Sequence, residues 1–138
     1  MPVFFDTNIL LYAAGNVVAE TEKRDIALAL LTRRDGVLSV QVLQEFFVQA
    51  TRPSRPDRLT EDQAARFVES WTRFTIQDNT LTTLRSALGI RARYGFSYWD
   101  SAVVAAARVA GCTELFTEDL SHGQVVEGVR IVNPFQPD

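Results

Sequence analysis

Short apolar runs alternate with longer segments of helical periodicity along the whole chain. Apolar residues that recur every three or four positions predict helices, whereas short apolar runs bounded by polar or turn residues predict strands. Strands that alternate with helices in this way favour an α/β fold with a parallel sheet. The predicted strands cover residues 3–5, 37–40, 74–76, 115–116 and 129–132, and the predicted helices begin at residue 6 and cover residues 20–34, 41–51, 60–73, 80–93 and 97–110.

Local sequence signals mark where several of these helices begin and end. Thr60-Glu61-Asp62-Gln63 and Ser97-Tyr98-Trp99-Asp100 have the spacing of capping boxes, which predicts helix starts at both places. The second of these helices is apolar nearly all round, which predicts that it is buried. Gly36 and Gly95 are expected to end the helical segments that precede them. Two prolines within residues 52–58 exclude a helix there, so we expect an exposed basic loop.

The composition suits one domain in a reducing compartment. A length of 138 residues predicts a single domain over residues 1–138. Cys112 is the only cysteine and is expected to be a small buried residue. An internal disulfide and a cysteine metal cluster are thereby excluded, and a cytoplasmic location is expected. No apolar run reaches the roughly 18 residues of a membrane span, and the N-terminus lacks the basic region of a signal peptide, so no membrane partner is expected.

The charged residues exclude some mechanisms without identifying a partner. The net charge of −3 gives no reason on its own to expect a nucleic-acid partner. Lys23 is the only lysine, so 13 of the 14 basic residues are arginine. A P-loop binds phosphate through a lysine within its own motif, and Lys23 is not part of such a motif. Phosphate binding by a P-loop is therefore excluded. The sole histidine, His122, is expected on the surface, because no Ser-His-Asp arrangement can be built around it.

Four carboxylates are expected to meet at one edge of the predicted sheet. Asp6 follows the first strand and Asp119 follows the fourth. Asp100 lies in the first turn of a predicted helix, and Glu45 lies about one turn into the helix after the second strand. In open α/β sheets, ligands bind in the crevice beyond the carboxyl ends of the strands, so all four side chains can reach one site.

Such a cluster would repel itself unless a cation neutralised it. Mg²⁺ and Mn²⁺ prefer oxygen ligands, and a metal bound by carboxylates is a common setting for phosphodiester hydrolysis. Each acid also has an ordinary structural interpretation: Asp6 as a helix cap, Asp100 as part of a capping box, Glu45 as a solvated residue, and Asp119 or Glu118 as a helix-start acid. The joint placement of the acids favours the metal site.

At these residues the sequence resembles the PIN domain family, and the resemblance covers almost the whole chain. Four segments resemble the acidic motifs of the family in the right order, and the end of the chain resembles that of the VapC branch. The segments are FFDTNIL at residues 4–10, VLQEF at residues 42–46, SYWDSAVVAAA at residues 97–107 and GCTELFTEDL at residues 111–120, with Gly128 and Asn133-Pro134-Phe135 near the end.

This resemblance implies a three-layer α/β/α sandwich with a mainly parallel sheet, and an endoribonuclease that depends on Mg²⁺ or Mn²⁺. It implies the toxin of a type II toxin–antitoxin system, with RNA as substrate and a VapB-type antitoxin as partner, and a homodimer is expected. The family's metal-binding and catalytic acids correspond to Asp6, Glu45, Asp100 and Asp119. The polar residues that support them correspond to Thr7, Asn8, Thr117 and Glu118. Because Glu118 and Asp119 are adjacent, either could be the fourth acid, and Asp119 is preferred.

Arginines and aromatic residues near the acids are the candidates for holding RNA. Arg52, Arg55 and Arg58 form the densest basic loop and are candidates for phosphate binding. Tyr98 and Trp99 adjoin the third acid and are candidates for stacking on an unpaired base. An ordinary interpretation stays open for each set, namely solvated surface for the arginines and core packing for Trp99.

A PIN-fold protein that binds RNA or a partner without cutting is the main alternative, and the presence of all four acids argues against it. A haloacid-dehalogenase-type phosphatase would need an aspartate where Asn8 stands, and a phosphoacceptor receiver domain would need a lysine after a later strand. Apolar residues on successive helices are expected in the core, or in part on a dimer or antitoxin surface. These residues are Phe46, Phe47, Phe67 and Trp71.

Overall fold

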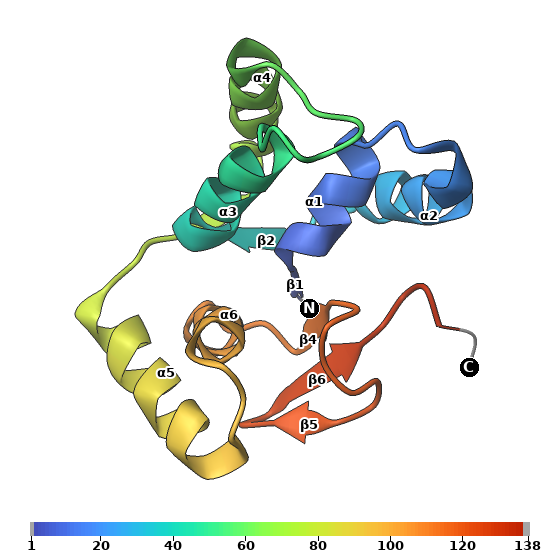
Figure 1. Cartoon of the computed structure of the whole chain (residues 1–138). Coiled ribbons are helices and arrows are strands. Elements are labelled where there is room, and N and C mark those ends of the chain that lie inside the picture. Colours follow the sequence, from blue (N-terminus) through green and yellow to red (C-terminus); the bar gives the residue numbers. More distant parts are fainter. Residues whose placement is uncertain (1, 137–138) are drawn as a thin grey trace.

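The structure is a computed structural model that describes residues 2–136. Its strands are β1 (Val3–Phe5), β2 (Gly36–Ser39), β3 (Thr75–Gln77), β4 (Glu114–Phe116), β5 (Val125–Val126) and β6 (Val129–Val132). Within the described chain these six strands form one sheet in the order β3-β2-β1-β4-β6-β5. Figure 1 shows the part of this order from β2 to β5. Every neighbouring pair is parallel except β5 and β6, so the mainly parallel sheet predicted from the sequence is confirmed.

Helices cover both faces of this sheet. They are α1 (Thr7–Ala14), η1 (Val18–Glu20), α2 (Thr21–Leu30), α3 (Val40–Ala50), α4 (Glu61–Trp71), α5 (Leu81–Tyr94) and α6 (Tyr98–Val109). β1, β2 and β3 follow one another outward in one direction, so right-handed crossovers place α1 to α4 on one face. The connection from β3 to β4 runs back, so α5 and α6 cover the other face (Figure 1). None of the helices in residues 2–136 is long and apolar enough to cross a membrane.

The strand order reverses between β1 and β4, and this reversal creates the place where a ligand can bind. β1 leads into α1 on one face, whereas β4 is reached from α6 on the other face. Phe5 is paired with Phe116, so the two strands end at the same level. The next residues along, Asp6 and Thr117, therefore lie side by side at the carboxyl edge of the sheet, which is where open α/β sheets bind ligands.

The core is built on β1 and α6. All three residues of β1 are almost completely buried, and so are residues 101–107 of α6, which confirms the predicted buried helix. The Phe5 ring stacks on Phe116 at a centroid distance of 5.8 Å and meets Phe74 edge-on at 6.0 Å. α6 contacts β2, β4 and β6 and so holds the middle of the sheet from one side.

The predicted helix boundaries are largely confirmed by the capping contacts. The Thr60 hydroxyl and the Gln63 side chain form the reciprocal capping box at the start of α4. The Ser97 hydroxyl accepts a hydrogen bond of 3.1 Å from the backbone N–H of Asp100 at the start of α6. Gly95 ends α5 in the left-handed conformation, as expected. These contacts fix Asp100 at the beginning of its helix.

The prediction for Gly36 was wrong. The predicted helix of residues 20–34 is shorter, since α2 ends at Leu30, and Gly36 is the first residue of β2. A Cβ atom at Gly36 would lie 2.6 Å from Cε2 of Phe5 and 2.9 Å from Cδ1 of Phe74. Glycine is required there because two aromatic rings occupy the space of a side chain, and a sequence pattern cannot show this contact.

The sequence prediction missed β5. β5 and β6 form a hairpin in which Val126 pairs with Val129, so only Glu127 and Gly128 form the turn. Both turn residues have positive φ, 50° and 84°, as a two-residue turn of type I′ requires. The Glu-Gly pair is a weaker turn signal than Asn-Gly or Asp-Gly, and a strand of two residues has no periodicity to detect.

We predict that Gly36→Ala destabilises the protein by about 1–3 kcal/mol, because the added methyl group overpacks the contact with Phe5 and Phe74. Gly89→Ala is the matched control, since a Cβ there meets nothing within 4 Å on the exposed side of α5. Alanine should stabilise that helix by up to about 1 kcal/mol. Urea unfolding of both variants measures the difference, and equal stabilities would contradict the packing argument.

Candidate active site

The four acids predicted from the sequence line one cleft of about 300 Å³ at the carboxyl edge of β1 and β4. Asp6 follows β1, Glu45 comes from α3, Asp100 from the first turn of α6, and Asp119 from the segment after β4. Thr7, Asn8 and Glu118 line the same cleft, and the buried Thr117 lies below it. The fold thus brings together side chains from four separate elements.

Asp6 is the most deeply placed of the four acids. Its side chain is 5% exposed. One carboxylate oxygen, Oδ1, accepts a hydrogen bond of 2.7 Å from the backbone N–H of Thr7. Asp6 therefore caps α1, which was one of the two interpretations of this residue from the sequence. The other oxygen, Oδ2, accepts a hydrogen bond of 2.8 Å from the Thr117 hydroxyl. Capping and membership of the acidic cleft are therefore properties of the same side chain.

The pKa of Asp6 is raised from its ordinary value of 3.8 to about 7, and the largest cause is burial. The hydrogen bonds from Thr117 and Thr7 act against this rise, and the negative charges of Asp119 and Glu45 add to it. The pKa of Asp100 is also raised, first by partial burial and then by the charge of Asp119, against a lowering hydrogen bond with Ser97. The acids therefore destabilise one another's ionised forms, and a bound cation would reverse that effect.

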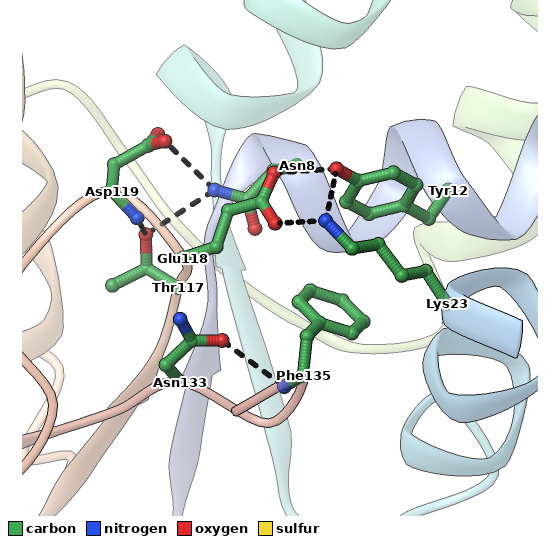
Figure 2. A network of polar contacts seen from close by, with 8 residues as sticks. All are labelled: Asn8, Tyr12, Lys23, Thr117, Glu118, Asp119, Asn133 and Phe135. Carbon is green, nitrogen blue, oxygen red and sulfur yellow. Dashed lines mark hydrogen bonds and ion pairs between the residues drawn. The ribbon is translucent and has the colours of Figure 1, made fainter. Parts of the chain in front are cut away.

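The Thr117 hydroxyl connects Asp6 to Asp119. It donates to Asp6 and accepts two hydrogen bonds, one of 3.2 Å from Asn8 Nδ2 and one of 3.1 Å from the backbone N–H of Asp119. These three bonds saturate a hydroxyl group, so its proton is directed at Asp6. Asn8 Nδ2 also donates to Asp119 Oδ2 at 3.1 Å (Figure 2). Asn8 and Thr117 thus act as polar support for two acids.

Glu118 points to a different set of partners. Its Oε1 accepts a hydrogen bond of 2.6 Å from the Tyr12 hydroxyl, and its Oε2 forms an ion pair of 3.0 Å with Lys23 (Figure 2). The Lys23 ammonium lies 4.9 Å from the centre of the Tyr12 ring and 5.5 Å from that of Phe135. Because the charge of Glu118 is neutralised by its ion pair with Lys23, the geometry favours Asp119 as the fourth acid.

Glu45 is half-buried and is held on both sides. Its Oε2 accepts a hydrogen bond of 3.2 Å from the Thr7 hydroxyl, and its Oε1 accepts one of 2.7 Å from Gln41 Nε2. Glu45, whose ordinary interpretation was a solvated residue, is therefore held in the cleft by two polar neighbours. Gln41, one turn earlier on α3, is a supporting residue that the sequence analysis did not single out.

The donor set of the cleft suits a hard divalent cation. All four acids offer carboxylate oxygens, and the buried Asn8 Oδ1 has no hydrogen-bond partner in the described structure. Within residues 2–136, however, no three acidic, histidine or cysteine side chains form a ready ligand set for one ion. Mg²⁺ commonly uses one or two carboxylates and keeps several waters, so this arrangement fits that ion without a complete protein cage.

Trp99 lies at the rim of the cleft with 63% of its surface exposed, so its interpretation as a core residue is wrong. Tyr98, by contrast, is half-buried and packs against the core. The two rings meet edge-on at a centroid distance of 5.1 Å, so Tyr98 supports the exposed indole from one side. Of the two aromatic candidates, only Trp99 presents a free face to solvent beside Asp100.

The arginines of loop 52–58 do not behave alike. Arg52 and Arg58 are exposed, as expected for a basic loop. Arg55 is half-buried, lines the cleft and forms an ion pair of 3.0 Å with Asp57, which corrects the prediction that the whole loop is exposed. The correction has a local cause, because Asp57 supplies a buried partner for one arginine of the three.

Other predicted side chains are placed as follows. Phe46 and Trp71 are buried in the core, whereas Phe47 and Phe67 are half-buried at its edge. Cys112 is 5% exposed, as expected. His122, expected on the surface, is half-buried, and its Nδ1 accepts a hydrogen bond of 2.9 Å from the backbone N–H of Asn133.

Tyr12 and Lys23, which contact Glu118 in Figure 2, were not identified as site residues from the sequence. Tyr12 lies one helical turn after Asn8 on α1. Helical periodicity therefore predicts that Tyr12 and Asn8 share one face of this helix. Lys23 comes from α2, and its ion pair joins residues 95 positions apart. Sequence spacing gives no signal for such a contact.

We predict that metal-free protein loses stability between about pH 4 and pH 7 through Asp6. Its raised pKa means that the folded state holds the proton more tightly than the unfolded state, so the free energy of unfolding falls as pH rises through this window. Asp6→Asn should flatten the fall and be more stable than the wild type at pH 8. Urea unfolding in EDTA measures both profiles, and parallel profiles would contradict this account of Asp6.

Comparison with known proteins identifies the fold family. The sequence model of the PIN domain matches residues 3–127. A toxin–antitoxin complex from Klebsiella pneumoniae contains a similar chain, with a TM-score of 0.72, 21% identity, and coverage of 98% of this chain and 99% of that one. VapC20 of Mycobacterium tuberculosis, a toxin that cleaves the sarcin–ricin loop, gives a TM-score of 0.63, 17% identity and coverage of 82% and 86%.

A third similar structure is DNA-bound VapBC from Salmonella typhimurium, with a TM-score of 0.67, 18% identity and coverage of 95% of this chain and 96% of that one. No curated protein matches the sequence. At these identities the structures show a shared fold, and the family match covers most of the chain. The protein belongs to the PIN domain family.

Proposed function

We propose that this protein is an endoribonuclease dependent on Mg²⁺ or Mn²⁺, and the toxin of a type II toxin–antitoxin pair. The observation that carries the proposal is the meeting of four carboxylates, from four elements, in one cleft at the carboxyl edge of a PIN-fold sheet. The similar structures include an RNA-cleaving toxin and two toxin–antitoxin complexes, which supports the same assignment.

Asp6 and Asp100 would hold the cation, and Glu45 and Asp119 would complete the site directly or through waters. When bound, the cation lowers the pKa of an attacking water and stabilises negative charge on the phosphate. The Thr117 hydroxyl keeps the Asp6 carboxylate in place, so its oxygens stay directed at the cleft. One of the carboxylates accepts the proton that the attacking water loses.

Trp99 would stack on an unpaired base of the RNA. Its exposed ring at the rim of the cleft is next to Asp100, and stacking on aromatic rings is how proteins commonly hold single-stranded RNA. Arg52 borders a neighbouring depression that also includes Trp99, and it would add attraction for the phosphates. A short single-stranded segment is therefore the substrate that this cleft suits best.

The partner proposed is a VapB-type antitoxin, and the protein is proposed to act in the cytoplasm as a homodimer. The similar chains from Klebsiella pneumoniae and Salmonella typhimurium are parts of toxin–antitoxin complexes. An antitoxin would keep a nuclease of this kind from cutting RNA until it is released. We also propose that residues 1–138 form a single domain, and the family match over residues 3–127 supports this proposal.

We predict that the purified, antitoxin-free protein cleaves a mixed RNA pool with Mg²⁺ or Mn²⁺ and that EDTA abolishes the cleavage. Asp6→Asn and Asp100→Asn should each lower the rate by more than about 100-fold, beyond the 10–100-fold typical of residues that only orient a ligand. Asp62→Asn is the control for loss of one carboxylate, since Asp62 is exposed on α4 and pairs with Arg66.

A folded protein that cuts no RNA with any divalent metal would contradict the proposed activity. It would move the assignment to the alternative, a PIN-fold protein that binds RNA or a partner without cutting. If Asp6→Asn still cleaves RNA, the protein remains a nuclease, but the proposed role of Asp6 in the site is contradicted.

We predict that Asp119→Asn lowers cleavage by at least about 100-fold, whereas Glu118→Gln lowers it by less than about tenfold. The reason is that Tyr12 and Lys23 engage both Glu118 oxygens, while Asp119 lies with the other acids. Cleavage rates of the two variants decide the question left open by the adjacent acids. The reverse order would make Glu118 the fourth acid.

A further inference from the structure

Arg55 is the only basic side chain that lines the acidic cleft within the described residues. An RNA phosphate that enters this cleft meets several negative charges, so a single fixed guanidinium there has a large effect on where the phosphate lies. The other charged residues of the lining are Asp6, Glu20, Glu45, Asp100, Glu118 and Asp119.

Asp57 fixes Arg55 at the edge of the cleft. Arg55 Nε and Asp57 Oδ1 are 3.0 Å apart, and the two side chains are 26% and 8% exposed. Asp57 Oδ2 accepts a hydrogen bond of 2.9 Å from the backbone N–H of Asn16, just after the end of α1. Gly15 permits this approach, because a Cβ there would lie 3.1 Å from Asp57 Oδ2. Asp57 therefore fastens the loop to α1 and holds Arg55 at the same time.

The backbone of the loop is also ordered around Arg55. The Arg55 N–H donates to the carbonyl of Arg52 at 3.0 Å, and the Arg55 carbonyl accepts from the N–H of Arg58 at 3.2 Å. The N–H of Leu59 donates to the carbonyl of Ala50 at 2.9 Å, which closes the loop where it leaves α3. Two consecutive turns thus present one arginine inward and leave the other two outside.

The guanidinium of Arg55 keeps its two terminal nitrogens available. The ion pair with Asp57 is formed by Nε at 3.0 Å, and no hydrogen bond of Nη1 or Nη2 is found within residues 2–136. A guanidinium that forms its ion pair on the Nε side can present these two nitrogens as a planar fork, which matches two oxygens of a phosphate. This separates Arg55 from Arg52 and Arg58, which are exposed and do not line the cleft.

We propose that Arg55 is a phosphate-binding subsite of the cleft and that Asp57 is its positioning residue. The ligand is a phosphodiester group of single-stranded RNA, held by the Arg55 fork at the side of the cleft where α1 ends. This inference rests on the proposed function for the identity of the ligand, and it adds the group that sets the position of the strand relative to the four acids.

The test measures RNA binding, so that it does not depend on cleavage. All variants carry Asp100→Asn, and the probe is a fluorescein-labelled, mixed-sequence, single-stranded RNA of 20 nucleotides in Mg²⁺. Fluorescence anisotropy gives the dissociation constant at several salt concentrations. The variants are Arg55→Gln, Arg55→Lys, Asp57→Asn and the double variant, with Arg85→Gln as control because Arg85 is exposed on α5, on the opposite face of the sheet.

We expect Arg55→Gln to weaken binding about tenfold and to make the slope of log affinity against log salt shallower by about 0.7, the value for one phosphate contact on a single strand. Arg55→Lys should recover only part of the affinity, since an ammonium lacks the fork. Asp57→Asn should weaken RNA binding less than Arg55→Gln does. The double variant should bind RNA with the same affinity as Arg55→Gln alone.

Equal losses in Arg55→Gln and Arg85→Gln would overturn the subsite, because they would show a general effect of net charge. Independent, additive losses from Asp57→Asn and Arg55→Gln would overturn the positioning role. If Arg55→Gln does not fold, Arg55→Lys decides alone, and unchanged affinity there overturns the fork contact. A wild-type protein that cuts no RNA, yet loses binding in Arg55→Gln, would contradict the proposed nuclease and leave the subsite standing.

Discussion

The burial of the Asp6 carboxylate at the end of β1 is the constraint on which the rest of the site depends. Moving a charged group out of water costs several kcal/mol unless hydrogen bonds or an opposite charge compensate. Here the compensation comes from a backbone N–H at the start of α1 and from the hydroxyl of Thr117, which directly follows the neighbouring strand β4. The remaining cost, visible in the raised pKa, is what a cation would remove on binding.

Helix α1 arranges the acids because it contacts the segment after β4 at two points. Asn8 contacts Thr117 and Asp119, and Tyr12, one turn later, contacts Glu118. The same short helix begins at Asp6 and ends where Asp57 is fastened. The two adjacent acids of this segment therefore have different roles, since Glu118 is neutralised by Lys23 while Asp119 stays at the rim of the cleft.

Sequence reasoning predicted the parts of this structure that depend on local pattern. Asp6 and Asp100 were found because each stands at a boundary that apolar runs and capping residues reveal, and the order of the elements then places them at one edge. Contacts between distant residues could not be read in this way. The rings around Gly36, the ion pair of Lys23 with Glu118 and the buried partner of Arg55 all depend on packing that forms only in the folded chain. Trp99 was ambiguous because a helix start does not show which side of the residue meets solvent.

The pairing of β1 with β4 has a consequence for when the cleft comes into existence during protein synthesis. Phe4 is paired with Leu115, and the Asp6 carboxylate receives its second hydrogen bond from a residue 111 positions later. A growing chain that ends before Glu114 therefore contains Asp6, Glu45 and Asp100 but lacks both β4 and the hydroxyl that binds Asp6. Residues up to Asp119 must therefore emerge from the ribosome before the four acids can assemble, and shorter polypeptides carry three of the acids without the assembled site.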